Sequence, residues 1–585
     1  MKTLLQRFRL WFLFGICLSL LLACGGGSST SQVFQADSFA SAEQVLQTQV
    51  LPNITVEEAL VSDGIASQYA IDQISAPLPR VEDYPLYGAQ PSTDPQTVYL
   101  EIYSSSEKGN AKREDERWLV EVADAFNARQ VQVSSGQVIQ VGIRNIPSGL
   151  ASQLLAAQAA KPAGFTPAND LWLQLLEKQG VQLESVATAL VPNHAGFVVD
   201  EKTYQSLAAT GTVTFERLLD AILAGDVTIG YPNPYASSTA LNLLYTIFWR
   251  AAGHHQDGKP LTAADLQSPQ VSSVFDTFQQ QVLVTTLTAP DLRDIFVRDR
   301  TQLQAFPLEY QNYVGLKTLP EFSQTAFIPF GVLHNSPLVG FAWNSPAQQE
   351  ALQKFADFAQ SDPMQRLATG KGFGQTDYAK LNKLPPAPSG EVLEAAQSFW
   401  KQRKDGGRTV YMMVVIDASG SMEGDRLTAV KEGLRIATQQ INAGNYVGLI
   451  SFGDRPRRLV KLDSFDEMQQ KRLLAAVDSL TADGATAMYD ATLVGLADLM
   501  AQKKTDPNGR YFLLLLTDGE VNRGYNFESI QAILQHGDVR IYPIAYGEVN
   551  QQELQAIANL RESTVQTGSP QTVEQLLRGL FQTNL

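Results

Sequence analysis

The chain has 585 residues, of which 44% are hydrophobic and 18% are charged, a globular composition that excludes wholesale disorder. Its formal net charge of −15 argues against nucleic acid as a main partner, because a phosphate backbone binds basic surfaces. The two cysteines, Cys17 and Cys24, both lie near the N-terminus, which excludes a disulfide-stapled fold and a cysteine-based metal centre. A chain of this length is expected to form about three to four domains.

The N-terminus has the pattern of an export signal. Basic residues precede an apolar run from Leu10 to Ala23, which is shorter than the roughly 20 residues needed to span a membrane. The run ends in Leu21-Leu22-Ala23-Cys24 before a Gly/Ser stretch, and this resembles the lipobox of bacterial lipoproteins. The resemblance implies that residues 1–23 are a cleaved signal peptide. It also implies that lipid on Cys24 anchors the protein to a membrane of the cell envelope, facing the periplasm or the cell exterior. An ordinary signal peptide with an incidental cysteine is the alternative.

Two segments of low regularity follow the signal and divide the body. Residues 24–95 are acidic, contain Arg80 as their only basic residue and show weak periodicity, so we expect an acidic tether. Packing of residues 50–85 on the body as an irregular arm is the alternative. Residues 384–407 combine a Pro-rich stretch with a short helical pattern and predict an interdomain linker.

Residues 96–383 alternate predicted strands and helices. A strand over 98–103, a helix that begins at Trp118, a strand over 137–143 and a helix over 150–160 form a β–α–β–α pattern. This order predicts a parallel sheet whose loops gather at the carboxyl ends of the strands. Side chains with a hydroxyl group follow several of these strands: Ser105, Ser106, Ser148, Ser237, Ser238, Thr239 and Tyr310.

This pattern resembles the type 2 periplasmic-binding fold of bacterial extracellular solute-binding proteins. The resemblance implies two lobes that close over a small polar ligand, with the seven hydroxyl-bearing residues lining the cleft. Three of them, Ser237 to Thr239, precede a long amphipathic helix over 240–252, whose free N–H groups and positive dipole end favour an anion or a polar ligand. Helix capping alone is the alternative for each of these residues.

Residues 408–585 predict a second, more regular sheet. An unbroken apolar run over 409–416 indicates a strand buried on both faces, and similar runs occur at 446–452, 511–516 and 539–547. Helical patterns separate them, so we expect a doubly wound α/β domain with its ligands outside the carboxyl ends of the strands.

Oxygen-bearing side chains follow three of these elements. They are Asp417, Ser419, Ser421, Thr486 and Asp518. Two carboxylates and three hydroxyls without histidine or cysteine predict a site for a hard cation, for which Mg²⁺ is the best fit and Mn²⁺ or Ca²⁺ are alternatives. The set leaves a coordination position that a partner's carboxylate can fill.

This arrangement resembles the von Willebrand factor type A domain and its metal-ion-dependent adhesion site, Asp-x-Ser-x-Ser with a distant Thr and Asp. The resemblance implies metal-dependent binding of a protein partner that offers an acidic residue. Two alternatives are a flavodoxin-like sheet with capped helices and a hydrolase that uses Asp417 as a nucleophile. The loops contain no Lys or His that could serve as a general base, which argues against the hydrolase.

A local basic cluster, Arg455, Arg457 and Arg458, lies in the predicted hairpin after 446–452. A solvated hairpin is one interpretation, and contact with an acidic partner is the other.

Together these features predict a two-lobed solute-binding-like domain (96–383) followed by a doubly wound, Rossmann-like A domain (408–585). We expect an extracytoplasmic binding or adhesion lipoprotein that is not an enzyme and does not bind nucleic acid. A transporter-associated extracellular solute receptor is the first alternative, and an accessory assembly factor is the second.

Overall fold

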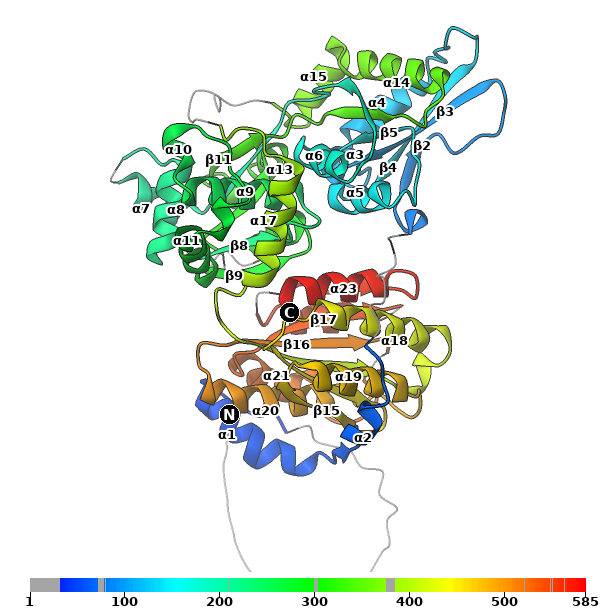
Figure 1. The fold of residues 1–585 in the computed structure, drawn as a ribbon. Coiled ribbons are helices and arrows are strands. Elements are labelled where there is room, and N and C mark those ends of the chain that lie inside the picture. The colour runs from blue at the N-terminus through cyan, green and yellow to red at the C-terminus, as the bar shows by residue number, and fades with distance from the viewer. Residues whose placement is uncertain are drawn as a thin grey trace, which may run out of the picture.

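The computed structural model describes residues 32–71, 78, 80–209, 211–298, 303–374, 384–519, 521–547, 549, 551–561 and 563–585. The predicted signal peptide and Cys24 lie outside these residues. Three sheets build the molecule, two in the upper part of Figure 1 and one below them. Within the described residues, no helix is both long and apolar enough to cross a membrane.

The first lobe contains a six-stranded sheet with strand order β2-β4-β3-β5-β12-β6. Its strands are β2 (Leu86–Gly88), β3 (Thr97–Ser104), β4 (Val138–Asn145), β5 (Gly164–Thr166), β6 (Leu183–Ala187) and β12 (Leu338–Phe341). Its helices are α3 (Ser106–Gly109), α4 (Trp118–Asn127), α5 (Ser148–Ala156), α6 (Leu171–Lys178), α14 (Pro346–Ala359) and α15 (Asp362–Gly370). The neighbours β3, β4 and β5 run parallel, as the β–α–β–α pattern predicts.

The second lobe contains a five-stranded sheet with strand order β11-β7-β10-β8-β9. Its strands are β7 (His194–Val199), β8 (Ile229–Pro232), β9 (Val282–Thr286), β10 (Ala305–Glu309) and β11 (Ala326–Leu333). Its helices are α7 (Glu201–Ala208), α8 (Phe215–Ala224), α9 (Ser238–Ala251), α10 (His254–Asp257), α11 (Pro269–Gln280), α12 (Ala289–Arg298) and α13 (Tyr310–Leu316). The sheet mixes parallel and antiparallel pairs, because β7 pairs with β10 and β11 in the antiparallel sense.

The lower sheet belongs to the C-terminal domain and has strand order β1-β15-β14-β13-β16-β17-β18. Its own strands are β13 (Val410–Asp417), β14 (Tyr446–Phe452), β15 (Pro456–Ser464), β16 (Arg510–Thr517), β17 (Arg540–Tyr546) and β18 (Gln566–Gly568). Its helices are α18 (Asp425–Ala437), α19 (Glu467–Ser479), α20 (Met488–Thr505), α21 (Phe527–His536), α22 (Gln551–Ala558) and α23 (Val573–Asn584).

The central strand β13 is buried along its whole length. Alternate side chains enter two separate cores: Met412 and Val414 pack with the helices of one face, and Met413 and Val415 with those of the other. A strand covered on both faces must be apolar at every position, which explains its unbroken hydrophobic run. The two-lobed and doubly wound architectures expected from the sequence are therefore confirmed.

The segment expected to be a tether packs in large part on the lower domain. It forms α1 (Phe39–Val45), a π-helical segment (Leu46–Val50), β1 (Glu57–Glu58) and α2 (Asp63–Ala66). We call residues 34–66 the arm. Strand β1 pairs in parallel with β15 and extends the sheet at its edge. The tether prediction is therefore wrong for these residues. The alternative of an arm over 50–85 describes the packing better, but the packed segment already begins at Phe34.

Apolar burial and ion pairs hold the arm in place. Its side chains Leu46 and Val50 are fully buried in the core that also contains Met413. The basic cluster contacts the arm as well, because Arg457 lies 3.1 Å from Glu57, and Arg458 forms an ion pair with Glu58. The acidic partner of that cluster is thus a segment of the same chain.

The linker prediction corresponds to α17 (Gly390–Arg403), which packs against α6 and α9. Single turns of 3₁₀-helix lie at Leu51–Asn53, Val81–Asp83, Glu114–Glu116, Asp265–Gln267, Pro320–Phe322, Gly420–Met422 and Thr438–Gln440.

Contacts beyond α17 join the lower domain to the rest of the molecule. A buried ion pair of 2.9 Å joins Asp405 to Arg510 of the lower domain. Helix α23 lies against the second lobe, where the Nδ2 of Asn233 donates to Gln582 and Thr583 over 3.1 Å. The lower domain is therefore docked mainly on the second lobe.

Candidate functional site

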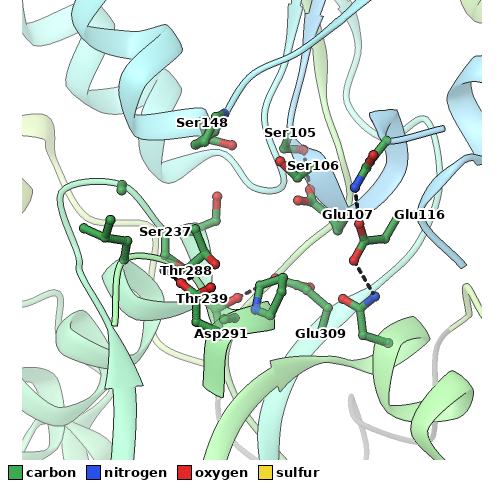
Figure 2. Close-up of a pocket in the computed structure, with 18 of the residues that line it drawn as sticks. Ser105, Ser106, Glu107, Glu116, Ser148, Ser237, Thr239, Thr288, Asp291 and Glu309 are labelled. Carbon is green, nitrogen blue, oxygen red and sulfur yellow. Dashed lines mark hydrogen bonds between the residues drawn. The ribbon is translucent and has the colours of Figure 1, made fainter. Parts of the chain in front are cut away.

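A cavity of about 290 Å³ lies between the two lobes and is lined by both (Figure 2). Six of the seven predicted cleft residues line it: Ser105, Ser106, Ser148, Ser237, Ser238 and Thr239. Loops and helix starts at the carboxyl ends of β3, β4 and β8 carry these residues, as expected for a sheet with parallel strands.

Tyr310 is not among the lining residues. Its ring stacks on His194 at 4.8 Å between centroids, while the preceding residue, Glu309, lines the cavity. Glu309 is the last residue of β10, and consecutive side chains at a strand end point in opposite directions. The prediction of this position was therefore wrong by one residue.

The three hydroxyl groups at the start of α9 have different partners. Ser237 caps the helix and accepts from the N–H of Ala240 at 3.4 Å. The Oγ of Ser238 accepts from the indole of Trp172 at 2.8 Å, and the Oγ1 of Thr239 donates to the Oε1 of Glu309 at 2.7 Å. Helix capping thus accounts for Ser237, a contact with Trp172 of the first lobe accounts for Ser238, and Thr239 joins a polar network behind the cavity.

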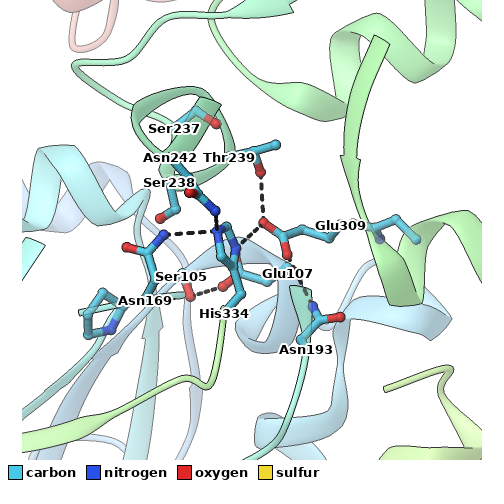
Figure 3. A network of polar contacts seen from close by, with 12 residues as sticks. Ser105, Glu107, Asn169, Asn193, Ser237, Ser238, Thr239, Asn242, Glu309 and His334 are labelled. Atoms are coloured by element: carbon cyan, nitrogen blue, oxygen red, sulfur yellow. Dashed lines mark hydrogen bonds and ion pairs between the residues drawn. The ribbon is translucent and has the colours of Figure 1, made fainter. Parts of the chain in front are cut away.

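Glu309 is the centre of that network (Figure 3). The Nδ1 of His334 lies 2.7 Å from its Oε1, and Asn193 donates to its Oε2 at 3.2 Å. The amide of Asn242 is fixed by two hydrogen bonds to Val332, so its Nδ2 is the donor that lies 2.9 Å from the Nε2 of His334. This geometry assigns the acceptor role to Nε2 and the proton to Nδ1, which donates to Glu309.

Opposing effects act on the pKa of the Glu309 carboxyl. Burial raises it, whereas the positive charge that His334 carries when protonated, together with the hydrogen bonds from His334 and Thr239, lowers it below its usual value. Three hydrogen-bond partners, Asn193, Thr239 and His334, therefore hold the carboxyl group of Glu309 in place at the floor of the cavity.

The first lobe also contributes charged groups that the hydroxyl pattern did not reveal. Glu107 and Glu116 line the cavity, and burial raises the pKa of Glu116 to about 7. Lys108 lies just behind the wall, where its Nζ donates to the Oγ of Ser105 at 2.5 Å and to the carbonyl of Thr166 at 2.9 Å. Their position soon after the predicted strand over 98–103 was a weak signal for Glu107 and Lys108, and no local pattern indicated Glu116.

A second cluster lies on the lower domain, at the carboxyl ends of β13 and β16. The Oγ atoms of Ser419 and Ser421 are 3.1 Å apart, and Ser421 donates to the Oδ1 of Asp518 at 2.7 Å. A Cβ atom at Gly519 would lie 3.6 Å from the Oγ1 of Thr486 and 3.7 Å from the Oγ of Ser421. The loop between α19 and α20 therefore brings Thr486 to the same place, and we call these residues with Asp417 the metal-loop cluster.

The geometry of the cluster fits a divalent cation. Neighbouring oxygen ligands of an octahedral Mg²⁺ lie about 3.0 Å apart, because each is about 2.1 Å from the ion. The observed separations of 3.1 Å and 2.7 Å are hydrogen-bond distances that lie near that edge length, so these oxygens are close enough to share one ion. Within the described part of the chain, no three His, Cys, Asp or Glu side chains gather as a metal site, so the cluster depends on its hydroxyls.

Three positioning residues of the cluster were missed. Thr517 donates to the Oδ2 of Asp417 at 2.6 Å, Asn522 accepts from the N–H of Thr486 at 2.8 Å, and Arg426 lies 2.5 Å from Asp518. Burial raises the pKa of Asp417, although its hydrogen bonds oppose the shift. Arg426 was the one of the three that its charge and position after the Ser-Gly-Ser loop could have indicated.

The fold and the two clusters define a protein with a solute-binding-like domain followed by a von Willebrand factor type A domain. Comparison with known protein families supports both domain assignments. Residues 116–374 match the bacterial extracellular solute-binding protein family, and residues 412–576 match the von Willebrand factor type A domain. Together the two matches indicate binding or adhesion outside the cytoplasm.

Individual relatives cover the chain in parts. It is 27% identical over 179 residues to an uncharacterized protein of Synechocystis sp., a match that covers 29% of this chain and 40% of that protein. It is 28% identical over 113 residues to the collagen alpha-6(VI) chain of Mus musculus, which covers 19% of this chain and 5% of that one. A periplasmic thiamin binding protein aligns with a TM-score of 0.39 and 13% identity, over 54% of this chain and 99% of that chain. The chain spans less than half the length of the curated relatives it matches.

Proposed function

We propose that the protein is a membrane-anchored, extracytoplasmic binding and adhesion protein without catalytic activity of its own. Its A domain binds Mg²⁺, with Mn²⁺ or Ca²⁺ as substitutes, and recognises an acidic side chain of a protein partner. Its two-lobed domain binds a small polar ligand. The convergence of Asp417, Ser419, Ser421, Thr486 and Asp518 at one sheet edge carries the proposal.

In this proposal, some residues of the metal-loop cluster bind the ion, and their neighbours orient them. The three hydroxyls and the two carboxylates would hold the ion, and the bound ion would supply a positive centre for the partner's carboxylate. Thr517 and the N–H of Ser419 fix the orientation of Asp417 from below. Two carboxylates leave such a site able to accept a third from the partner.

The decisive experiment is a pull-down with the full chain from envelope or host-surface extracts, in Mg²⁺ and in EDTA. We expect partners that are retained in Mg²⁺ and lost in EDTA. The matched controls are Asp417→Ala, which removes a proposed ligand, and Glu423→Ala, which removes an exposed carboxylate of the same loop. Identical capture in Mg²⁺, in EDTA and with Asp417→Ala would contradict metal-dependent recognition.

Anchoring is a separate part of the proposal. It is supported by the lipobox-like sequence that ends at Cys24. The variant Cys24→Ser should move the protein from the detergent phase to the aqueous phase in detergent partitioning, because the acyl chains are its proposed membrane attachment. Unchanged partitioning of the variant would contradict lipidation at this cysteine.

The alternative function is a transporter-associated solute receptor, and one observation favours it. The cavity lies between two lobes and has a buried polar floor around Glu309 and His334, as a ligand-closing receptor requires. Deletion of a neighbouring permease gene should abolish uptake of the ligand in this case. In the binding and adhesion case, that deletion should leave partner capture unchanged.

A further inference from the structure

Acidic side chains dominate the wall of the cavity between the lobes. Glu107 and Glu116 come from the first lobe, and Asp291 and Glu309 from the second (Figure 2). Among the described residues that line it, Arg113 is the one basic side chain, and its guanidinium already lies 3.7 Å from Glu116. Four carboxyl groups face one basic side chain, which favours a cation over an oxyanion. Burial raises the pKa of Glu116 and of Asp291, and a nearby ligand cation would stabilise their ionised forms.

The carboxylates are distributed around the cavity instead of converging. No three acidic, His or Cys side chains lie close enough together to hold a metal ion in the described part of the chain. A point charge such as Ca²⁺ needs six to eight oxygen ligands around one centre, which this wall does not offer. An extended cation can instead place separate charges opposite separate carboxylates.

Two groups that could bind an anion are already engaged by the protein. At the start of α9, Thr239 donates to the carboxylate of Glu309, which places a negative charge at the helix end that would otherwise attract an anion. The Nζ of Lys108 is fully buried and donates to Ser105, Thr166 and Pro167. Among the described lining residues, Arg113 keeps one cationic donor without a hydrogen-bond partner, its Nη1, which lies 3.7 Å from the carboxylate of Glu116. One donor that is already paired in charge with Glu116 is a poor match for a sulfate or a phosphate.

One buried hydroxyl points to a ligand. Ser148, at the start of α5, is 3% exposed and lines the cavity, yet its Oγ has no hydrogen-bond partner in the structure. Buried polar groups of proteins nearly always have a partner, so this oxygen is available to a donor from the ligand. It can accept from an ammonium group as readily as from a hydroxyl group.

The geometry points to a small organic cation with two separated amino groups, a diamine, as the ligand of the cleft. One ammonium group pairs with Glu116 on the first lobe, the other pairs with Asp291 on the second, and Ser148 accepts a further hydrogen bond. Such a ligand bridges the lobes, which gives a direct reason for the cleft to close on it. This inference rests on the proposal that the cleft binds a polar ligand and adds the charge class of that ligand.

The test uses the full chain in detergent with EDTA present, so that the A domain does not respond. Isothermal titration calorimetry and thermal shift are measured with 1,4-diaminobutane, sulfate and glucose at constant ionic strength. We expect binding of 1,4-diaminobutane alone. Glu116→Gln and Asp291→Asn should each weaken it about ten- to a hundredfold, since each removes one charge-assisted hydrogen bond. Glu177→Gln, an exposed carboxylate on α6, is the matched control and should bind like the wild type.

The outcomes separate the two levels of the proposal. Binding of glucose or sulfate without 1,4-diaminobutane would overturn the cation class and leave the polar-ligand cleft standing. Binding of 1,4-diaminobutane that survives both substitutions would place it outside the cleft and overturn the inference. Binding of none of the three probes would overturn the inference and remove the support for a ligand cleft as well.

Discussion

The metal-loop cluster and the cleft are both acidic, yet they differ in how their charges are arranged. In the cluster, the hydroxyl of Ser421 lies 2.7 Å from Asp518 and 3.1 Å from the hydroxyl of Ser419, so the oxygens converge on one point. In the cleft, Glu116 and Asp291 stand on different lobes. A converging set suits a small divalent ion and a distributed set suits an extended organic cation, so the spacing of carboxylates selects the ligand more than their number does.

The largest expected effect comes from Asp417→Ala. It should abolish the rise in melting temperature caused by Mg²⁺, because it removes one of the two charges that attract the ion. The response to 1,4-diaminobutane should remain, since the cleft is a separate site. Thermal shift with each ligand measures both, and Glu423→Ala serves as the control. Loss of both responses would show that the two sites are not independent, and an intact Mg²⁺ response would refute the role of Asp417.

The next effect concerns the pH dependence of stability. Burial raises the pKa of Glu116 from 4.5 to about 7, with Asp115 and Glu107 adding to the shift and Arg113 opposing it. Between these pH values the folded chain binds a proton that the unfolded chain has released. Its stability should therefore fall by about 3 kcal/mol as the pH rises through this window.

Urea unfolding at pH 5 and pH 8 measures this slope. Glu116→Gln should remove this contribution and be more stable than the wild type at pH 8. Bound 1,4-diaminobutane should also flatten the slope, because a nearby ammonium group keeps Glu116 ionised. Equal slopes in the wild type and the variant would contradict the raised pKa.

A smaller effect is expected for Thr486→Ala. This substitution removes one neutral ligand and leaves both carboxylates, so we expect Mg²⁺ affinity to fall about tenfold, corresponding to one hydrogen-bond-sized interaction. Calorimetric titration with Mg²⁺ gives the ratio directly. A loss as complete as that of Asp417→Ala would mean that hydroxyl geometry, and not charge, dominates the site.

The smallest effect is expected for Arg426→Gln. Arg426 lies 2.5 Å from Asp518, and its positive charge competes with the ion for that carboxylate. Its side chain is 43% exposed, so solvent weakens the competition, and Mg²⁺ affinity should rise by less than about fivefold. Arg435→Gln, on the same helix but paired with Glu432 and Asp478, is the control. Weaker Mg²⁺ binding by Arg426→Gln would contradict the competition.

Much of the fold could be predicted from the sequence, because buried strands such as β13 must be apolar throughout. The five residues of the metal-loop cluster could be found because they follow strands or form a short motif. The cleft carboxylates Glu116 and Asp291 could not, since they lie in a turn and a helix whose approach depends on how the two lobes pack. No local pattern encodes that packing.

The arm shows a second limit of prediction from the sequence. Leu46, Val50 and Ile54 recur every four residues, a spacing that indicates one helical face, but the surface that buries them lies hundreds of residues away. Glu57 and Glu58 looked like part of an acidic tether because their partners, Arg457 and Arg458, form a separate basic cluster. Matching the two clusters by charge could have suggested the contact.

The arm also has a consequence for the order of folding. It leaves the ribosome 400 residues before the strand it pairs with, as the separation of Glu57 and Arg457 shows. At roughly 5–20 residues per second, synthesis alone separates the two by about 20–80 s. During that time Leu46 and Val50 have no core in which to pack, because the lower domain that buries them has not been synthesised. Docking of the arm therefore waits until β15 and the core around Met413 have formed, and its apolar side chains stay exposed until then.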